Sequence, residues 1–368
     1  MAKKKVIVWA PGAMGQAAIR ELQRIPELEL AGVLAYSEDK NGKDVSELIG
    51  GEPTGVTITT DKEAIFAMPA DCVIHTAAPL PDITMYDDDV IRLLESGKNV
   101  ISISSYHFSH LYGPERVAKL EAACRKGKST LHGTGIHPSF VFERVGLTAT
   151  GLSNRIEHVR IREIVSMQEV QSQQLLMAFG FGLDPNKDVF ADDGMVSMLL
   201  SHYYKESLNF FAYKVFGKLL DRVEKQSSQG VAEEDIPMRA MTISKGKVAR
   251  TEVTYTGYID DKPRVTMQEQ WYAAPKYCPV PGMEQPHYWD VEVEGEPVSL
   301  RLRMETFVSV KNNTQHYEND PTMVPYYASV TPAIQSVARV CDAEPGLLYQ
   351  DVFAHSRPDL SVVGTQIA

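Results

Sequence analysis

The feature that most constrains the fold is a regular alternation of short β-branched segments with helical segments between residue 5 and about residue 140. Parallel neighbouring strands need a crossover connection, which is usually a helix, so this order is typical of a doubly wound parallel sheet. The predicted strands are residues 5–10, 28–36, 71–77, 99–104 and 129–133, and the predicted helices are residues 13–24, 61–68, 87–96 and 114–126. The sequence therefore predicts an α/β fold whose first domain, residues 1–150, is of the Rossmann type.

The pattern changes after about Gly151. Successive strand-like segments with turn signals at residues 260–261 and 295–296 predict a second, α+β domain over residues 151–319, with a mixed or antiparallel sheet. A long helical region at residues 194–220 carries aromatic residues that line either a substrate pocket or a core. Residues 225–235 are predicted to be a flexible loop. Residues 320–368 are predicted to form a helix and tail that return to the first domain.

Composition and charge narrow the functional classes. Acidic residues outnumber basic ones by 48 to 37, the net charge is -11, and no basic cluster follows a predicted helix, so a nucleic-acid partner is disfavoured. No segment approaches the roughly 18 to 20 apolar residues that a membrane helix needs. The four cysteines are dispersed, which predicts free thiols in a reducing compartment and a soluble, cytoplasmic protein. His107 and His110 have no third ligand nearby in sequence, so no metal site is predicted.

The first predicted strand runs directly into Ala10-Pro11-Gly12-Ala13-Met14-Gly15, the G-x-G-x-x-G pattern with alanine at its first position. Gly12 would let the backbone approach a pyrophosphate, and Gly15 would allow close helix–sheet packing. The helix N-terminus supplies N–H groups and the positive end of a dipole. We therefore predict that Pro11, Gly12, Ala13, Met14 and Gly15 bind a nicotinamide dinucleotide. The alternative is a tight glycine-rich turn without a ligand.

An NAD-specific enzyme usually places a carboxylate about 20 residues beyond this motif. Here Ala35, Tyr36 and Ser37 occupy that region, and Ser37 with Lys40 favours the 2′-phosphate of NADP. Glu38 and Asp39 favour NAD, so NAD stays open. Further cofactor contacts are predicted where strands end, because ligands of open α/β sheets bind at the carboxyl ends of the strands. These residues are Thr76, Ala77, Ala78, Pro79, Ser102, Ser104 and Gly135.

Together these segments resemble the family with a dihydrodipicolinate-reductase-like N-terminal domain, and within it the branch of 2,4-diaminopentanoate dehydrogenase and the native amine dehydrogenases. The resemblance also rests on the segments 33–44, 97–102, 132–140 and 320–347. It implies a Rossmann domain, a substrate domain whose mixed sheet forms a homodimer contact, and a C-terminal helix beside the cofactor. It also implies hydride transfer between nicotinamide and a carbon that bears nitrogen or oxygen.

Two departures concern the chemistry. Amine-forming members carry a glutamate after the "NVIS" segment, whereas this chain reads Ile103-Ser104-Ser105-Tyr106-His107; His137 replaces an asparagine that is usual in the family. Tyr106, His107 and His137 are therefore the predicted catalytic residues, with Tyr106 as proton donor. Each of them could instead pack against the next helix. Another carboxylate, such as Glu143 or Glu163, could replace the missing glutamate.

Three functions remain open at this point. The first is an NAD(P)-dependent reductase or dehydrogenase that acts on a carbonyl or alcohol carbon of a small, fairly apolar substrate, because such a reaction needs only a proton donor. The second is an amine dehydrogenase or imine reductase that acts on a C–N bond. The third is a non-catalytic dinucleotide-binding sensor. The loss of the carboxylate favours the first, and whole-chain similarity favours the second.

Overall fold

The computed structural model describes residues 3–79, 82–190, 194–280, 287–306, 322 and 324–349. The chain forms two units, and each is described separately below. Unit 1 contains the chain up to Phe140, together with α9 (Val324–Cys341) and β15 (Gly346–Leu348). Unit 2 begins at Val141 and includes the strands up to β14 (Leu300–Thr306).

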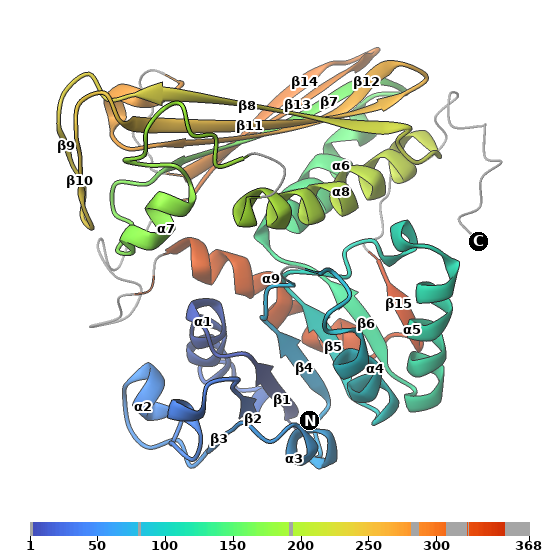
Figure 1. Ribbon diagram of the computed structural model, residues 1–368. Helices are drawn as coiled ribbons and strands as arrows, with labels where there is room; N and C mark the ends of the chain where they lie inside the picture. The colour runs from blue at the N-terminus through green and yellow to red at the C-terminus, as the bar shows by residue number, and fades with distance from the viewer. Residues whose placement is uncertain are drawn as a thin grey trace. The chain divides into compact units, whose positions relative to one another are not determined.

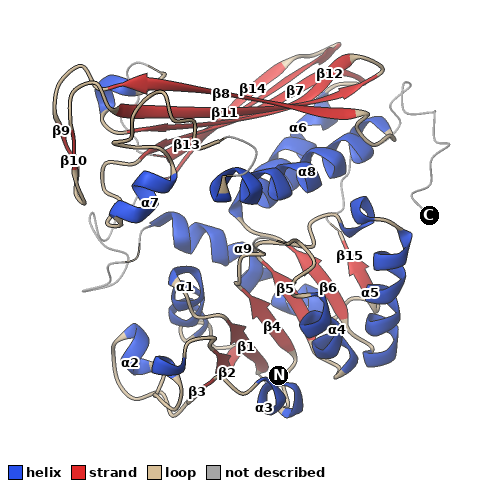
Figure 2. Ribbon diagram, viewed as in Figure 1, coloured by secondary structure: helices blue, strands red, loops and turns tan. Residues whose placement is uncertain are grey.

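Unit 1 is built on a seven-stranded sheet with the order β15-β6-β5-β4-β1-β2-β3 (Figures 1 and 2). All its strand pairs are parallel, and the order reverses at β1, which confirms the predicted doubly wound sheet. The strand β15 was not predicted. The other strands are β1 (Lys4–Trp9), β2 (Leu28–Leu34), β3 (Ile58–Thr59), β4 (Cys72–His75), β5 (Asn99–Ser102) and β6 (Thr130–Gly133).

Helices cover both faces of this sheet because its strands alternate between two apolar cores. Val6 and Val8 pack with α1 and α9 in one core, whereas Ile7 and Trp9 pack with α4 and α5 in the other. The helix α9, which comes from the far end of the chain, lies beside α1 (Figure 1). The remaining helices of unit 1 are α1 (Ala13–Leu22), α2 (Ser46–Ile49), α3 (Lys62–Ala67), α4 (Asp87–Glu95) and α5 (Pro114–Gly127).

Unit 2 contains a six-stranded sheet with the order β14-β13-β7-β12-β11-β8 (Figure 2). The β12–β7 pair is parallel and the other pairs are antiparallel, so the predicted mixed sheet is confirmed. The strands are β7 (Arg155–Ser166), β8 (Arg222–Val231), β11 (Val248–Ile259), β12 (Lys262–Tyr272) and β13 (His287–Glu296). Smaller elements are α6 (Leu147–Ala149), α7 (Gln173–Ala178), β9 (Ile236–Pro237) and β10 (Thr242–Ile243).

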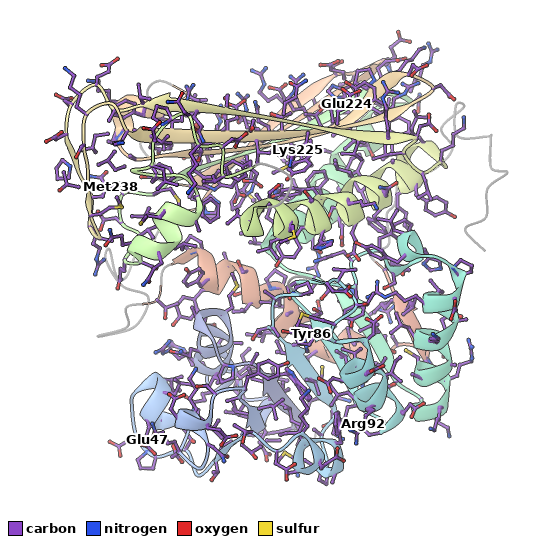
Figure 3. The ribbon with its side chains drawn as sticks, viewed as in Figure 1. Glu47, Tyr86, Arg92, Glu224, Lys225 and Met238 are labelled. Carbon is purple, nitrogen blue, oxygen red and sulfur yellow. The ribbon has the colours of Figure 1, made fainter. Side chains whose placement is uncertain are left out.

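One face of the unit 2 sheet packs against α8 (Met195–Phe216). The two faces are visible at β8, where Lys225 points towards α8 and donates to the Ser197 Oγ at 2.8 Å, whereas Glu224 points to the opposite face (Figure 3). The helix ends at Gly217, which has a φ of 68° that favours glycine. Within the aromatic segment of α8, Phe210 and Phe211 are core residues.

The prediction of a flexible loop at residues 225–235 is wrong for most of that segment, because residues 222–231 form β8. This strand lies at the edge of the sheet and pairs only with β11. An edge strand with half-exposed faces can keep a polar sequence, so the apolar alternation that identifies a strand is missing. None of the helices in the described part of the chain is long and apolar enough to span a lipid bilayer.

Candidate cofactor and active site

The loop between β1 and α1 approaches its neighbours too closely for side chains at one position. The N–H of Gly12 donates to the Ala10 carbonyl at 2.8 Å, which closes the turn. A Cβ at Gly15 would lie 2.6 Å from the Ala10 carbonyl oxygen and 3.0 Å from the Thr76 Oγ1. Ala10 itself has a φ of 72°, where an L-residue is strained. Gly15 is therefore required by packing between the loop and the first turn of α1.

The space in front of α1 has the properties of a phosphate site. Gly12 is the N-cap of α1, and no described side chain caps this N-terminus. A Cβ at Gly12 would meet no described atom within 4 Å, so the backbone is open on that side. The free N–H groups of a first helical turn and the dipole favour an anion there. The segment Pro11, Gly12, Ala13, Met14 and Gly15 thus fits the pyrophosphate of a dinucleotide.

The predicted cofactor residues of the next loops lie at the same edge of the sheet. Thr76 follows β4, and its hydroxyl donates to the Ala10 carbonyl at 2.6 Å. The Ser104 hydroxyl, beyond β5, donates to the Ala77 carbonyl at 2.6 Å. The Ala78 carbonyl accepts from the Tyr86 hydroxyl at 3.3 Å, and Pro79 is buried. Unit 1 therefore joins the loops that follow β1, β4 and β5 into one surface.

The loops after β5 and β6 are also joined. The Thr134 N–H donates to the Ser102 carbonyl at 2.8 Å, and the Ser102 hydroxyl accepts from the Ser105 N–H at 3.1 Å. Gly135 has a φ of 151°, and a Cβ there would lie 3.3 Å from the Ile103 carbonyl oxygen. The structure thus brings Ser102, Ser104 and Gly135 together beside the predicted nicotinamide position, and their contact with the cofactor stays a prediction.

Ser37 and Lys40 lie in the turn that follows β2. The Lys40 Nζ lies 3.5 Å from the Pro11 carbonyl oxygen, so this ammonium group stands next to the phosphate-binding loop. The Ser37 hydroxyl donates to the Asp39 carboxylate. A cation beside the first loop suits a 2′-phosphate, whereas the carboxylate bonded to Ser37 suits two ribose hydroxyls. The geometry alone leaves the choice between NADP and NAD open.

An aromatic cluster that the sequence does not predict lies at the same edge of the unit 1 sheet. It consists of Trp9, Tyr36, His75 and Tyr86 (Tyr86 is labelled in Figure 3). The Trp9 indole N–H donates to the Tyr36 hydroxyl at 2.7 Å, and the side chain of Tyr36 stacks on Tyr86. Burial lowers the pKa of His75 to about 4, so its imidazole is neutral at pH 7. The sequence signal for this cluster is the presence of an aromatic or histidine residue at the end of each of the strands β1, β2 and β4.

Tyr106 is held in the interior of unit 1. It is only 2% exposed, has a φ of 65°, and its hydroxyl donates to Asp87 at 2.8 Å. Asp87 also receives two bonds from the Arg116 guanidinium, at 2.7 and 2.8 Å. The turned backbone directs the tyrosine into the helix layer formed by α4 and α5 rather than to the edge of the sheet. This geometry favours a structural role for Tyr106 over the predicted proton donation.

The two predicted catalytic histidines are positioned differently from each other. His107 is buried, and its backbone lies against β6, since a Cβ at Gly133 would lie 2.6 Å from the His107 backbone nitrogen. His137 is half-buried and has extended backbone angles within an otherwise helical segment at residues 136–146. Of the two, His137 is therefore better placed to meet a ligand, and its catalytic role remains a prediction.

Unit 2 contains a second group of titratable side chains, which we call the acid pair: Glu163 on β7 and Glu269 on β12. The two residues are partners in the parallel register, and a carboxylate oxygen of one lies within 4.8 Å of a carboxylate oxygen of the other. The Tyr204 hydroxyl on α8 donates to Glu269, and the His287 imidazole on β13 bonds to Glu163. The acid pair is thus enclosed by three strands and α8.

The acid pair has a distinct electrostatic state. Glu269 is 0% exposed, and burial, followed by the Glu163 charge, raises its pKa well above its usual range. Burial and then Glu269 raise the pKa of Tyr204 as well. Burial and Glu163 therefore favour the protonated form of Glu269, and His287 bonds to the other member of the pair, Glu163. The sequence suggests Glu163 only as a possible replacement for the missing glutamate. The sequence signal for Glu269 is a glutamate at an inward-facing position of the apolar segment 265–273.

The chain is similar to several known proteins. Residues 4–86 match the family described as dihydrodipicolinate reductase, N-terminus. The chain is similar to an amine dehydrogenase of Streptomyces virginiae, with 24% identity over 97% of this chain and 98% of that protein. Among solved structures, it resembles amine dehydrogenase from Mycobacterium smegmatis, with a TM-score of 0.68 and 18% identity over 94% of this chain and 95% of that one.

A more distant similarity concerns the fold. Biliverdin reductase from Synechocystis, solved with biliverdin and NADP+, gives a TM-score of 0.51 with 12% identity over 97% of this chain and 94% of that one. These findings confirm the resemblance inferred from the sequence and the Rossmann-plus-mixed-sheet fold.

The two glycines of the first loop give a matched test of cofactor binding. We expect Gly12→Val to fold normally, because its Cβ meets nothing, and to weaken NAD(P)H binding more than about tenfold, or ~1.4 kcal/mol, because the side chain fills the pyrophosphate position. Gly15→Val should instead destabilise unit 1 by about 1–3 kcal/mol through overpacking. Fluorescence titration and thermal unfolding separate the two effects. Undiminished binding by folded Gly12→Val would contradict the phosphate site.

Tyr106→Phe distinguishes a structural from a catalytic tyrosine. Loss of the hydrogen bond to Asp87 should lower the free energy of unfolding by about 1.5–3 kcal/mol, the range for bonds to charged groups. Turnover at a temperature where the variant is folded should fall by less than about tenfold, since loss of a true general acid costs about 10²–10⁴-fold. A hundredfold loss of turnover with unchanged stability would restore the catalytic assignment.

Proposed function

We propose that this protein is an NAD(P)-dependent oxidoreductase that transfers a hydride to or from a carbon bearing nitrogen, and so forms or oxidises an amine. Whole-chain similarity to an amine dehydrogenase and the shared architecture support the predicted NAD(P)-dependent enzyme. The observation that carries the choice of a C–N bond is the acid pair of unit 2, in which burial and the neighbouring Glu163 raise the pKa of the Glu269 carboxyl, and His287 bonds to Glu163.

The acid pair supplies what reductive amination requires. Addition of ammonia to a ketone gives a carbinolamine, and loss of its hydroxyl as water needs a proton from an acid. Burial and the charge of Glu163 favour the protonated form of Glu269, so this carboxyl is suited to give a proton. Once ionised, the same pair is an anionic site for the cationic iminium. When bound, a dinucleotide would supply the hydride, and the predicted cofactor residues of unit 1 would hold it.

Carbonyl or alcohol chemistry stays the second candidate. The segment after β5 favours this carbonyl or alcohol chemistry. There the Ser104 hydroxyl donates to the Ala77 carbonyl, and no carboxylate is present between Ile103 and His107. Reduction of a ketone to an alcohol needs a single proton donor and no base for ammonia. The two candidates differ in whether ketone reduction depends on ammonium.

Wild-type protein is expected to oxidise NAD(P)H with a ketone substrate only when ammonium is present. In Glu269→Gln, that rate should fall by about 10²-fold or more, because the amide fills the same space but cannot release a proton. The absorbance of NAD(P)H measures the rate of the wild-type protein and that of the variant. Glu206→Gln is the matched control: Glu206 is also buried in unit 2, on α8, and lies outside the acid pair. Equal ketone reduction with and without ammonium would establish the carbonyl alternative.

We propose NADP as the preferred cofactor, with NAD as the alternative. The support is the Lys40 ammonium group 3.5 Å from the Pro11 carbonyl and the lack of a carboxylate at residues 35–37. Lys40→Ala should lower the ratio of kcat/KM for NADP to that for NAD by about tenfold or more, since a bond between charged groups contributes about 1.5–3 kcal/mol. The exposed neighbour Lys43→Ala is the control and should leave the ratio unchanged. A clear NAD preference in wild-type protein would assign the ribose to Glu38 or Asp39.

We further propose a cytoplasmic homodimer. The family resemblance implies a dimer contact through the sheet of unit 2, and the face of that sheet opposite α8 bears a polar hollow of about 880 Å3. Arginines and glutamates alternate there, such as Arg160, Arg162 and Glu252, which suits a self-complementary contact. The four cysteines are free thiols, consistent with a reducing compartment.

A further inference from the structure

Tyr36 of unit 1 reverses the usual orientation of a tyrosine at a protein surface. A tyrosine usually packs its ring inside and presents its hydroxyl to water, because the ring is apolar and the hydroxyl is not. The Tyr36 hydroxyl instead accepts a hydrogen bond from the indole N–H of Trp9 at 2.7 Å, and Trp9 is fully buried. The residue is nevertheless 49% exposed. The polar end of Tyr36 is therefore taken up by the protein, whereas apolar surface of its ring is left in water.

The exposed ring is held in one position. Tyr36 stacks on Tyr86, which is labelled in Figure 3, with ring centroids 6.2 Å apart and an angle of 20° between the planes. The Lys62 Nζ lies 5.8 Å from the centroid of the Tyr36 ring, and it is itself fixed by an ion pair with Asp89 at 2.6 Å. Together with the bond from Trp9, these contacts come from β1, α3 and the start of α4. A ring that is already immobilised binds a ligand with little further loss of conformational entropy.

The ring stands next to the loop that fits a pyrophosphate. Tyr36 lies two residues beyond the end of β2, at the carboxyl edge of the sheet, where open α/β sheets bind their ligands. Its partner Trp9 is the last residue of β1 and directly precedes the loop between β1 and α1. In the same turn as Tyr36, the Lys40 Nζ lies 3.5 Å from the Pro11 carbonyl oxygen of that loop. A flat apolar surface and an anion site are thus neighbours within unit 1.

The chemistry of this surface selects its ligand. An aromatic base stacks on an aromatic side chain through its π-face, without needing hydrogen bonds to the base. A carboxylate here would bind the hydroxyls of a ribose, but residues 35–37 contain none. The Tyr36 hydroxyl cannot replace it, because it is turned inward to Trp9. What Tyr36 offers beside the pyrophosphate position is therefore ring surface, which suits the base of a dinucleotide better than its sugar.

We propose that the ring of Tyr36 is the platform on which the adenine of the dinucleotide stacks. The proposal deepens the cofactor binding predicted for unit 1 and rests on it. Stacking acts on the base and not on the 2′ position of the ribose, so Tyr36 contributes equally to the binding of NADP and NAD. The choice between the two cofactors is then made by other groups of the same turn, such as Lys40.

The test is calorimetric titration of the full-length protein with four probes. These are NADPH, NADH, ADP-ribose, which lacks the nicotinamide ring, and reduced nicotinamide mononucleotide, which lacks the adenosine. Tyr36→Leu should raise the Kd of NADPH, NADH and ADP-ribose by about tenfold, because the stacking of one base is lost. The ratio of the Kd values for NADPH and NADH should stay the same. The Kd of the mononucleotide should also stay the same, since that probe has no base to place on Tyr36.

Two further variants separate the ring from other effects. Tyr36→Phe keeps the ring and loses the hydroxyl, so its Kd values should stay within about threefold of the wild-type values. Tyr258→Leu is the matched control: Tyr258 is a partly exposed tyrosine of unit 2, and the Arg222 guanidinium lies 4.1 Å from its ring centroid. It should change none of the four Kd values. Thermal unfolding shows that each variant is folded at the temperature of the titration.

Unchanged dinucleotide binding by folded Tyr36→Leu would overturn the platform. So would an equal loss of mononucleotide binding, which would reveal a general distortion of unit 1, or an equal loss in Tyr36→Phe, which would assign the effect to the hydroxyl. If wild-type protein binds neither NADPH nor NADH, the cofactor binding itself is refuted and the platform with it. None of these readouts involves a ketone or ammonium, so the result stands apart from the proposed amine chemistry.

Discussion

The parallel sheet of unit 1 must be covered on both faces, and most of the architecture of this unit follows from that requirement. Val6 and Val8 face one core, and Ile7 and Trp9 face the other, so a helix layer on only one side would leave a row of apolar side chains in water. The first part of the chain supplies α1 to one face, and α9 completes that layer from the other end of the sequence. The helix layer on this face of the sheet is thus completed by a helix that follows the strands of unit 2 in the sequence.

Two buried acids in unit 2 differ in the side chains that surround them. Asp290 is 1% exposed, yet two bonds from Arg303, at 2.6 and 3.0 Å, and Arg162 at 3.3 Å compensate its charge. Glu269 is equally buried, and burial and the charge of Glu163 raise its pKa, whereas the hydrogen bond from Tyr204 lowers it. Asp290 is therefore a structural group held in ion pairs, whereas burial and Glu163 favour the protonated form of Glu269. That difference, rather than burial itself, is the reason to assign chemistry to Glu269.

The sequence predicts those parts of the molecule that local rules determine. The strand β1, its glycine loop and the start of α1 are readable because an apolar run, a turn and an amphipathic segment follow each other directly. The edge strand β8 and the short strand β15 are not, since the pairing partner supplies most of what stabilises them. The acid pair was missed for a related reason: Glu163 and Glu269 become neighbours only through the parallel register of β7 and β12, which are far apart in sequence.

The segment after β5 shows why a family resemblance cannot carry a catalytic residue by position alone. Here Ser104 bonds to Ala77, Ser102 bonds to the backbone of Ser105, and Tyr106 turns inward with a positive φ. These hydrogen bonds stabilise the loop without a carboxylate. The hydroxyl groups of Ser102 and Ser104 are already hydrogen-bonded to backbone groups. A proton for C–N chemistry must then come from another element, and the buried carboxyl of Glu269, whose pKa is raised, is a group of the required type. The loss of one glutamate is thus compatible with amine chemistry if the acid has moved from a loop of unit 1 to a strand of unit 2.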